Sequence, residues 1–525
     1  MSMSIAGLPA SGLSSNRPDR SAASTAPNLK IYVALAGAAV VRLWIMPMTA
    51  SLWLDETTTY WTACKGMSAA ISRSQFWPGQ NVLYSLIAAL ALRLGGNSEF
   101  ALRFPSLLAA LATIWLLFRL GTRLLDRETG LLAVVVFVSL QEMSETAANA
   151  RPYAIALLLV VGSMLQLVRW LDTGRARNLL GYVILTAAIP YFHYLFATVF
   201  VVHTAYALYR SRGEVRVRLA RLVAAVAMVG ILLSPLIWNA IHGNHISAAS
   251  SFLPTPDFER FVSSLMPAVL GAGIFAGLLL GYVWFRQVSA GERLEASPET
   301  ALLLICWLVI PIVACFTVSR LTGFKIFVSR YYLPAFPALA LLVAWGIRSL
   351  LPGKIRVCVA GGIVAAALLS FGTHHFWVNP HLEDWRAAAQ TIRAAGVDGN
   401  TPVLVRTGLI ETAKPTWSLD LDRDSPLLAP LSRYPIPGRI ILVPALLNDD
   451  SVRYMNEVSS QILEPASEFL CVTRDVGDAF QPWLSGRFSG KGFAVSKMGH
   501  ADGVSVFRFR RLAASSRSNL PSNAP

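Results

Sequence analysis

The feature that most constrains this chain is a series of long apolar runs that begins at Ile31 and ends at Phe376. Runs of roughly 17–25 apolar residues are long enough to cross the hydrocarbon core of a bilayer. Only 14% of the 525 residues are charged, whereas soluble domains carry about a quarter. The sequence therefore predicts a polytopic membrane protein built of α-helices.

Lysine and arginine in short loops indicate sidedness, because such residues concentrate on the cytoplasmic side. Arg17, Arg20 and Lys30 place the N-terminus inside, so that the first span, about 31–48, leads outward. The apolar piece 82–94 is too short to cross and is expected to be a juxtamembrane helix, which makes the second span about 105–120. With about eleven spans in all, every later cytoplasmic loop is basic: Arg119–Arg127, Arg169–Arg177, Arg210–Arg221, Arg286–Arg293 and Arg348–Arg356.

The unusual polar residues gather in loops that this threading places on the outer face. These loops are Ser51–Phe104, Gln141–Arg151, Tyr191–Tyr194, Asn239–Arg260 and Arg320–Arg330. The last of them is basic, against the general rule, and suits an anion. The formal charge of +15 does not indicate nucleic acid, because the arginines lie in small groups between apolar runs.

Composition divides the chain into four parts. We expect a disordered cytoplasmic tail at 1–29, a transmembrane domain at 30–377 with an outer loop at 49–104, a small extracytoplasmic α/β domain at 378–511, and a disordered tail at 512–525. In the α/β part a helical pattern at Glu383–Ala395 precedes strand-like runs at 403–406, 440–443, 469–472 and 504–509.

Cysteine and histidine spacing gives little support for a metal site. The five cysteines contain no C-x-x-C pair. Cys64 and Cys471 would both lie outside, where a disulfide is an alternative and two free thiols are favoured. His242 and His245 form an H-x-x-H, which is a weak signal alone. No metal ligand is assigned.

The segment Trp53-Leu54-Asp55-Glu56-Thr57-Thr58-Thr59-Tyr60 directly follows the first span. Two adjacent carboxylates at a lipid boundary are costly to desolvate and are suited to acid/base chemistry. The alternative is a solvated loop beside an aromatic belt. The segment by itself does not separate the two.

Further motifs follow this segment in a fixed order and on the same expected side. They are Leu83-Tyr84, Glu99-Phe100-Ala101-Leu102-Arg103-Phe104-Pro105-Ser106, Arg151-Pro152-Tyr153-Ala154, His193-Tyr194 and Arg330-Tyr331-Tyr332-Leu333-Pro334-Ala335-Phe336-Pro337. With Asp55-Glu56 at its head, this set resembles the GT-C-type glycosyltransferases that depend on a polyprenyl-phosphate sugar, such as the protein O-mannosyltransferases and the lipid A aminoarabinose transferases. The resemblance covers about 29–376.

Two positions depart from that family's pattern. Trp77-Pro78-Gly79-Gln80-Asn81 stands where relatives usually carry a His-Pro-Pro-type segment. Asn149 stands where many carry a carboxylate, and Glu145 lies one helical turn earlier, at a spacing that faces the same way. The sugar and the acceptor therefore do not follow from the resemblance.

The resemblance implies an inverting glycosyltransferase with a GT-C-like fold in the inner, or plasma, membrane. Its donor would be a polyprenyl-phosphate-linked sugar and its acceptor a lipid, a glycan or a protein at the extracytoplasmic face. Asp55 would be the base that takes the acceptor proton. Glu56 would orient the acceptor or position a cation, with a solvated companion charge as the alternative. No cofactor is assigned, and a divalent metal stays open.

The departing phosphate calls for fixed cations. Arg330 is the first candidate, with Lys325 and Arg320 as helpers, and contact with lipid headgroups is the alternative. Arg151 would bind phosphate or pair with Glu145.

Aromatic and imidazole groups complete the expected substrate site. His193 and Tyr194 would contact sugar hydroxyls, and Tyr331 adjoins Arg330. A structural role in an aromatic belt is the alternative. For the whole chain, a transporter or flippase of lipid-linked sugars and a non-catalytic relative remain alternatives, although the polar residues gather at one face rather than at the bilayer midplane.

Overall fold

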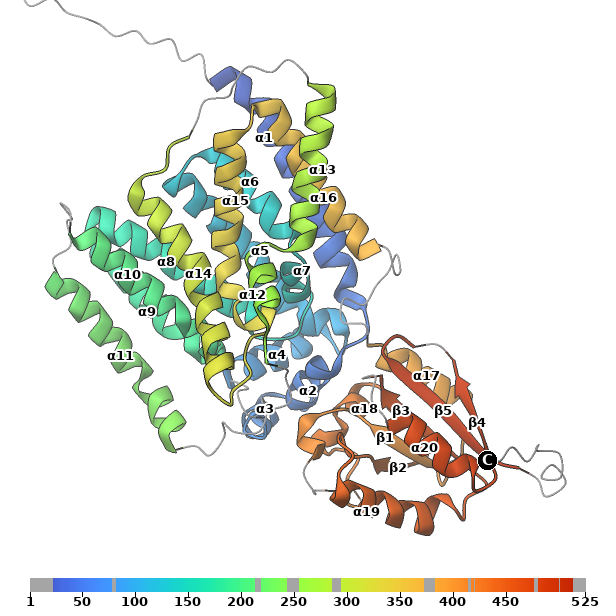
Figure 1. The fold of residues 1–525 in the computed structure, drawn as a ribbon. Helices are drawn as coiled ribbons and strands as arrows, with labels where there is room; N and C mark the ends of the chain where they lie inside the picture. Colours follow the sequence, from blue (N-terminus) through green and yellow to red (C-terminus); the bar gives the residue numbers. More distant parts are fainter. Residues whose placement is uncertain are drawn as a thin grey trace, which may run out of the picture.

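The computed structural model describes residues 22–77, 82–212, 219–242, 255–285, 294–372, 383–413, 417–419, 421–475, 480–499 and 501–512. Figure 1 shows a tall bundle of helices with a small sheet region beside one end. Several positions discussed above fall outside the described residues: 1–21 and 513–525 of the expected tails, Pro78–Asn81, and His245.

Seven helical stretches of the described residues are long and apolar enough to cross a membrane, which confirms a polytopic helical protein. The first of them, Asn28–Thr49, contains the expected span at 31–48. The seven are built on α1 (Ala22–Ala39), α5 (Glu99–Leu124), α8 (Tyr153–Thr173), α11 (Leu219–His242), α14 (Pro298–Leu321), α15 (Phe336–Leu350) and α16 (Gly353–Gly372).

Two further crossings are each a pair of helices bent at a short break. The pair α6 (Arg127–Ser139) and α7 (Gln141–Ala147) is bent by 75°, and the pair α12 (Phe258–Leu265) and α13 (Ala268–Trp284) by 49°. These bring the crossings among the described residues to as many as nine. Two more apolar helices, α9 (Ala176–Phe192) and α10 (Val199–Ser211), pack against α8 and α14. The number of about eleven stays a prediction.

The second span begins earlier than the sequence suggested. The sequence pattern places its start at about Pro105. In the structure Ser98 caps the helix by accepting a hydrogen bond from Ala101 N at 3.1 Å, and Pro105 lies inside α5. A cap of this kind satisfies a free N–H at the true start, so α5 includes the whole Glu99–Ser106 motif.

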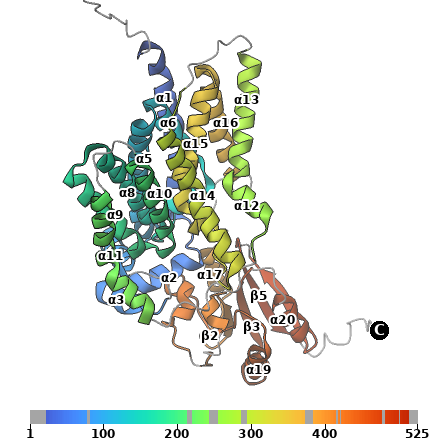
Figure 2. The ribbon, with the colours of Figure 1, turned by 60° about the vertical axis from the view of Figure 1, so that its left-hand side comes forward.

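The bundle has two chemically different ends. The C-terminal ends of α5, α8 and α10 meet at one end, where Asp172 of α8 pairs with Arg123 of α5 and Arg210 of α10. At the opposite end α2 (Leu54–Ala63), α3 (Met67–Ser74) and α4 (Val82–Gly95) lie beside the sheet region, as Figures 1 and 2 agree. Helix α4 has only 14 residues, in keeping with the expected juxtamembrane helix.

Helices α13 and α16 approach closely through glycines. A Cβ at Gly273 would lie 2.6 Å from Ile363 Cα, and Gly362 faces the same contact from α16. Small residues at such spacing allow helix backbones to meet inside a membrane, where dispersion rather than hydrophobic burial holds helices together.

The sheet region contains five strands in the order β2-β1-β3-β5-β4, parallel at β2-β1-β3 and antiparallel at β3-β5-β4. The expected runs at 403–406, 440–443, 469–472 and 504–509 coincide with four of them, and the strand 493–498 was not expected. The elements are α17 (Trp385–Ala394), β1 (Pro402–Arg406), α18 (Ala429–Arg433), β2 (Arg439–Leu442), α19 (Asp449–Val458), β3 (Glu468–Arg474), α20 (Phe480–Ser489), β4 (Phe493–Met498) and β5 (Val504–Arg511).

Alternation along β3 explains why both faces of the sheet are covered. Leu470 and Val472 join a core with α17, whereas Phe469 and Cys471 join a core with α19 and α20. Successive side chains of a strand point to opposite faces, so one apolar run builds two cores. Cys471 is buried there and Cys64 is free as well, so the disulfide alternative is wrong.

Candidate active site

The Trp53–Tyr60 segment forms the start of α2. Trp53 has an extended backbone and Glu56 Oε2 accepts a hydrogen bond from its N–H at 3.3 Å, while Asp55 and Glu56 lie in the first turn. Carboxylates there are favoured by the helix dipole and the free N–H groups. Glu56 and Thr57 through Ala63 are buried, which rules out the solvated loop that the sequence left open.

Asp55 is the exposed member of the carboxylate pair. Its side chain is 28% accessible and its Oδ2 lies 3.4 Å from Arg330 Nη1. Arg330 belongs to the short 3-10 turn Ser329–Tyr331, which leads through Leu333–Ala335 into α15. The fold thus joins the segment after the first span to the loop before a late span, and it brings together two residues that the sequence analysis named for the site.

Arg151 approaches the same turn of α2 from the loop before α8. Its Nη1 donates to the backbone oxygen of Asp55 at 3.3 Å and to Thr59 Oγ1 at 3.5 Å. Among the described residues, the buried Nε atoms of Arg151 and Arg330 have no hydrogen-bond partner. Two partly buried guanidiniums with unused Nε donors next to one carboxylate make an arrangement suited to an oxyanion.

Charge within this cluster favours the cationic form of Arg330. Burial alone would lower the pKa of Arg330, but nearby Tyr153 and the Asp55 carboxylate raise it above its ordinary value. The guanidinium also lies 5.3 Å from the ring of Tyr331. Arg330 is therefore held as a fixed positive charge.

His193 closes the aromatic side of the cluster. Its ring centroid lies 5.2 Å from that of Tyr153, 5.6 Å from Tyr331 and 4.6 Å from Phe196. Burial, followed by the positive charges of Arg151 and Arg330, lowers the pKa of His193 to about 3. The imidazole is therefore neutral, and its Nδ1 has no hydrogen-bond partner in the described part of the chain.

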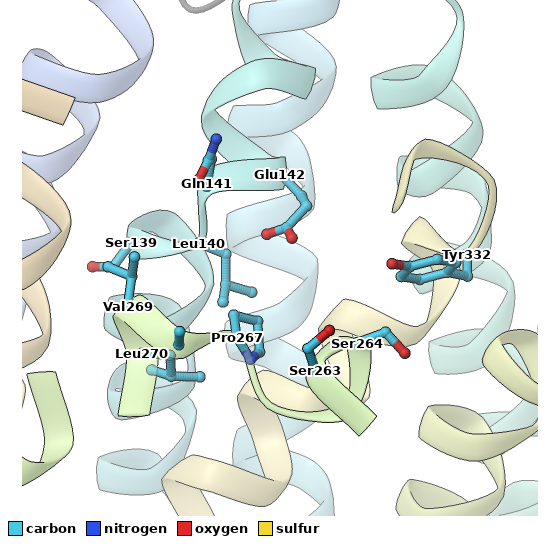
Figure 3. Close-up of a pocket in the computed structure, with 11 residues that line it drawn as sticks. Ser139, Leu140, Gln141, Glu142, Ser263, Ser264, Pro267, Val269, Leu270 and Tyr332 are labelled. Atoms are coloured by element: carbon cyan, nitrogen blue, oxygen red, sulfur yellow. The ribbon is translucent and has the colours of Figure 1, made fainter. Parts of the chain in front are cut away.

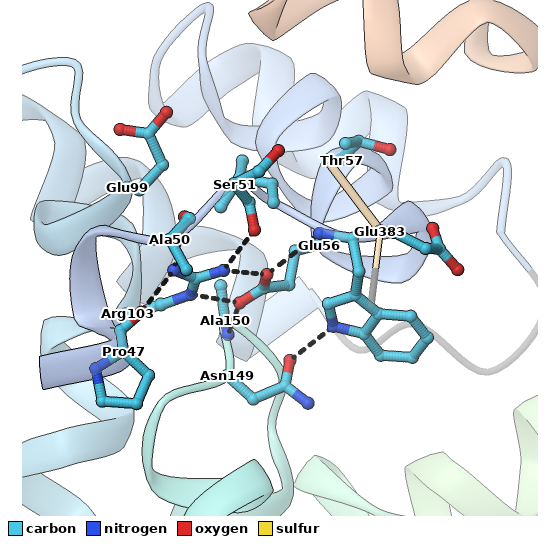
Figure 4. Close-up of polar contacts among 12 residues, drawn as sticks. Pro47, Ala50, Ser51, Glu56, Thr57, Glu99, Arg103, Asn149, Ala150 and Glu383 are labelled. Atoms are coloured by element: carbon cyan, nitrogen blue, oxygen red, sulfur yellow. Dashed lines mark hydrogen bonds and ion pairs between the residues drawn. The ribbon is translucent and has the colours of Figure 1, made fainter. Parts of the chain in front are cut away.

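Glu56 is the inaccessible member of the carboxylate pair. It is fully buried, and Arg103 binds both of its oxygens, through Nε at 2.7 Å and Nη2 at 2.5 Å. Its Oε1 also accepts from Ala150 N at 2.7 Å. Figure 4 shows Arg103 at the centre of these contacts. The pair fits the expectation that Glu56 positions a cation, here Arg103, whereas a role in orienting an acceptor stays a prediction that the burial of both oxygens does not favour.

Arg103 itself ties the segment between the first span and α2 to α5. Besides Glu56, its guanidinium donates to four backbone oxygens, those of Pro47, Met48, Ala50 and Ser51, at 2.8–3.1 Å. A buried charge is tolerated when it is paired and hydrogen-bonded in this way. Sequence reasoning missed this role, although an arginine near the start of an apolar span is itself a signal that a partner is needed.

The C-terminal region also forms hydrogen bonds with the segment between the first span and α2. Glu383 Oε2 accepts from Leu54 N at 2.9 Å, and the hydroxyl of Tyr434 accepts from Leu52 N at 2.8 Å. Burial, against the opposing effect of Arg474, raises the pKa of Glu383. The sheet region therefore helps to set the position of Asp55, which the sequence did not predict.

Four other residues named from the sequence lie apart from this cluster or make different contacts. Glu145 Oε1 accepts from Gln141 at 2.9 Å instead of pairing with Arg151. Tyr194 is 42% exposed. Lys325 donates to the backbone oxygens of Ser319 and Thr322 at the end of α14, and Arg320 donates to Pro256 O. The structure thus gives no support to Lys325 and Arg320 as helpers of Arg330.

A cavity of about 280 Å³ opens where the two bent helix pairs break, next to Leu140 and Pro267. Figure 3 shows the Glu142 carboxylate and the Tyr332 hydroxyl turned toward the same space. Glu142 Oε2 is buried without a partner among the described residues. Irregular backbone within a membrane is tolerated where it lines such a cavity. The polar cavity therefore accounts for the two helix breaks that border it.

The described residues contain no group of three or more His, Cys, Asp or Glu side chains that could hold a metal ion. Asp55, Arg151 and Arg330, with His193, Tyr153 and Tyr331, are what the fold brings together. Of these, Tyr153 was quoted in a motif but was not assigned a role.

Comparisons with known proteins bear on the fold of the chain and on part of its sequence. Residues 80–238 match the family model described as dolichyl-phosphate-mannose-protein mannosyltransferase, a range that includes Arg103 and Arg151 but not Asp55 or Arg330. A comparison with curated proteins finds no match.

Two solved structures of ArnT from Cupriavidus metallidurans share the fold. The structure bound to undecaprenyl phosphate has a TM-score of 0.56 at 10% identity, over 93% of this chain and 98% of that one. The apo structure has a TM-score of 0.53 at 11% identity, over 92% and 98%. At this identity the likeness concerns the fold. At the level of the fold, the resemblance drawn from the sequence is confirmed: the chain has a GT-C-type fold, which it shares with ArnT, and residues 80–238 match the mannosyltransferase family model.

Proposed function

We propose that this protein is an inverting glycosyltransferase that moves a sugar from a polyprenyl-phosphate carrier to a lipid, glycan or protein acceptor. The transfer would take place at the extracytoplasmic face of the inner, or plasma, membrane. The single observation that carries the proposal is the cluster in which the accessible Asp55 carboxylate meets two arginines with unused buried donors.

The arginines suit the phosphate of the carrier. Arg330 and Arg151 have unused donors that a phosphate oxygen would satisfy, and both stand next to helix ends of apolar spans. Negative charge grows on the phosphate as it departs, and fixed cations stabilise that charge without reorganising. ArnT, which has the same fold, binds undecaprenyl phosphate, and this supports a lipid-phosphate donor here.

Asp55 suits the role of general base. As the acceptor oxygen attacks the anomeric carbon, its proton passes to the Asp55 carboxylate, and the bond from that carbon to the phosphate oxygen breaks with its electron pair left on the phosphate. A single displacement of this kind inverts the anomeric centre. The ion pair between Asp55 and Arg330 is partly exposed and, at 3.4 Å, longer than a close charged hydrogen bond. An incoming phosphate can therefore replace Asp55 as the partner of Arg330 and leave the carboxylate for the acceptor.

The two ends of the bundle support the proposed sidedness. The arginine-bearing C-terminal ends of α5 and α10 lie at the end away from α2. Basic short loops concentrate in the cytoplasm, which supports an extracytoplasmic position for Asp55 and for the sheet region.

The test uses the full chain in liposomes with a radiolabelled polyprenyl-phosphate sugar, and it follows both transferred sugar and released polyprenyl phosphate. Loss of a positioned base slows such reactions about 10²–10⁴-fold, so Asp55→Asn should lower transfer by that factor while the protein still folds. Arg330→Gln should weaken use of the donor.

The matched control is Asp450→Asn, which removes an exposed carboxylate that pairs with Arg453 on α19. It should transfer sugar at the normal rate. Full activity in Asp55→Asn would overturn the assignment of the base, and normal membrane export of lipid-linked sugar by this variant would favour a transporter.

A further inference from the structure

At the end of the bundle away from Asp55, α5 and α8 line a basic cavity that is open to its surroundings. Its volume is about 460 Å³, and it is lined by Arg119, Thr122, Arg123, Arg169 and Asp172. Three arginines and one carboxylate leave the lining with an excess of positive charge. The sequence indicates only that these loops are basic; the fold gathers their arginines around one space.

The one carboxylate is already neutralised by other partners. Asp172 Oδ2 pairs with Arg123 at 2.6 Å, and its Oδ1 pairs with Arg210 at 3.0 Å. In the part of the chain that the structure describes, Arg119 and Arg169 have no acidic side chain within ion-pair distance. Neighbouring guanidiniums repel each other, and an anion between them would reverse that repulsion.

The surroundings of Arg119 indicate a lipid rather than a free ion. Its guanidinium lies 5.4 Å from the ring of Trp115, one turn earlier on α5, and that ring is 56% exposed. Tryptophan and arginine at the end of a span are typical of the headgroup level. Leu111 and Leu108 continue the exposed apolar row along α5, where acyl chains could lie.

We propose that this cavity binds the phosphate group of an anionic phospholipid in the leaflet opposite the Asp55 site. Arg119 and Arg169 bind the phosphate, and Arg123 stays with Asp172. The bound lipid holds together the far ends of α5 and α8, whose near ends carry Arg103 and adjoin Arg151. The site is independent of the proposed transfer reaction.

The experiment places the purified full chain in nanodiscs of phosphatidylcholine with an increasing fraction of phosphatidylglycerol. Native mass spectrometry measures retained phosphatidylglycerol, and the thermal unfolding midpoint measures its effect. A basic side chain near the surface contributes about 1 kcal/mol toward an anionic lipid, so Arg119→Gln/Arg169→Gln should lower the affinity about thirty-fold and abolish the rise in midpoint.

The matched control is Arg127→Gln/Arg212→Gln, which removes the same charge from two exposed positions that do not line the cavity, the first residue of α6 and the residue after α10. It should retain the lipid as the wild type does. If the glutamine pair does not fold, Arg119→Lys/Arg169→Lys keeps the charge but loses bidentate contacts, and it should lose part of the affinity.

Two results would overturn the proposal. Equal loss of lipid in the cavity pair and in its control would show a diffuse attraction without a site. An equal rise in midpoint with inorganic phosphate at matched ionic strength, in phosphatidylcholine alone, would assign the cavity to a free anion instead of a lipid.

Discussion

Replacing Glu56 with glutamine tests whether this residue holds the active-site helix or takes part in chemistry. The substitution keeps the shape of the side chain and removes the charge opposite Arg103. In the wild type both groups are inaccessible to solvent and are joined by contacts of 2.5 and 2.7 Å. Arg103 would remain buried as a charge without its carboxylate.

The expected cost follows from the contacts that survive. Removing one partner of a buried ion pair costs about 3–5 kcal/mol. The lower end, about 3 kcal/mol, applies here because Arg103 keeps four backbone oxygens as acceptors. The neighbouring Asp55→Asn breaks only a half-exposed contact of 3.4 Å, and such pairs contribute about 1 kcal/mol or less.

The assay compares both variants by reversible unfolding in mixed micelles and by sugar transfer per folded molecule. Glu56→Gln should be the less stable variant with transfer largely retained, whereas Asp55→Asn should be nearly as stable as the wild type and inactive. Adding Arg103→Gln to Glu56→Gln should cost less than the two single losses together, since the groups act as a unit. A Glu56→Gln protein of normal stability without transfer would refute the structural role.

Three further predictions concern groups around the site and in the bundle. Glu383→Leu removes the acceptor of Leu54 N at the start of α2. Loss of such a cap costs about 1 kcal/mol, so both the transfer rate and the thermal stability should fall. Glu383→Gln keeps an acceptor and should largely retain both. The folded-state pKa of His193, about 3, lies below that of an unfolded histidine, so the contribution of His193 to stability is present above about pH 6.5 and is lost as pH falls from there toward 3. His193→Gln should therefore make unfolding less acid-sensitive in that window, and an unchanged pH dependence of unfolding would contradict this prediction. Gly273→Ala places a Cβ 2.6 Å from the backbone of α16 and should destabilise the bundle by about 1–3 kcal/mol, whereas Gly271→Ala in the same helix meets nothing within 4 Å and should not.

Much of the fold could be predicted because its signals are local. Apolar runs, basic loops and strand-like alternation are properties of short windows, and a bilayer demands that backbone groups be satisfied inside each helix. The end of a helix is less well defined by such windows, as the misplaced start of α5 at Pro105 shows. The strand 493–498 was missed because its burial alternates irregularly, with a mostly exposed centre.

The candidate site could be predicted only in part, for a related reason. Asp55, Arg151, Arg330 and His193 were named from motifs at span edges, and the fold brings these four together. The residue types of Asp55 and Glu56 do not indicate which of the two carboxylates is accessible. In the structure, the helical turn of α2 directs Glu56 toward Arg103 and leaves Asp55 accessible.

By itself, the sequence determined that the chain crosses a membrane repeatedly and that its reactive groups gather at one end, because transfer free energies and loop charge act residue by residue. Only the tertiary structure decided the partners: Glu56 with Arg103, Asp55 with Arg330 across 275 positions, and Glu383 on the N–H of Leu54. Such pairings depend on distances between distant segments, and those distances exist only once the helices and the sheet have packed.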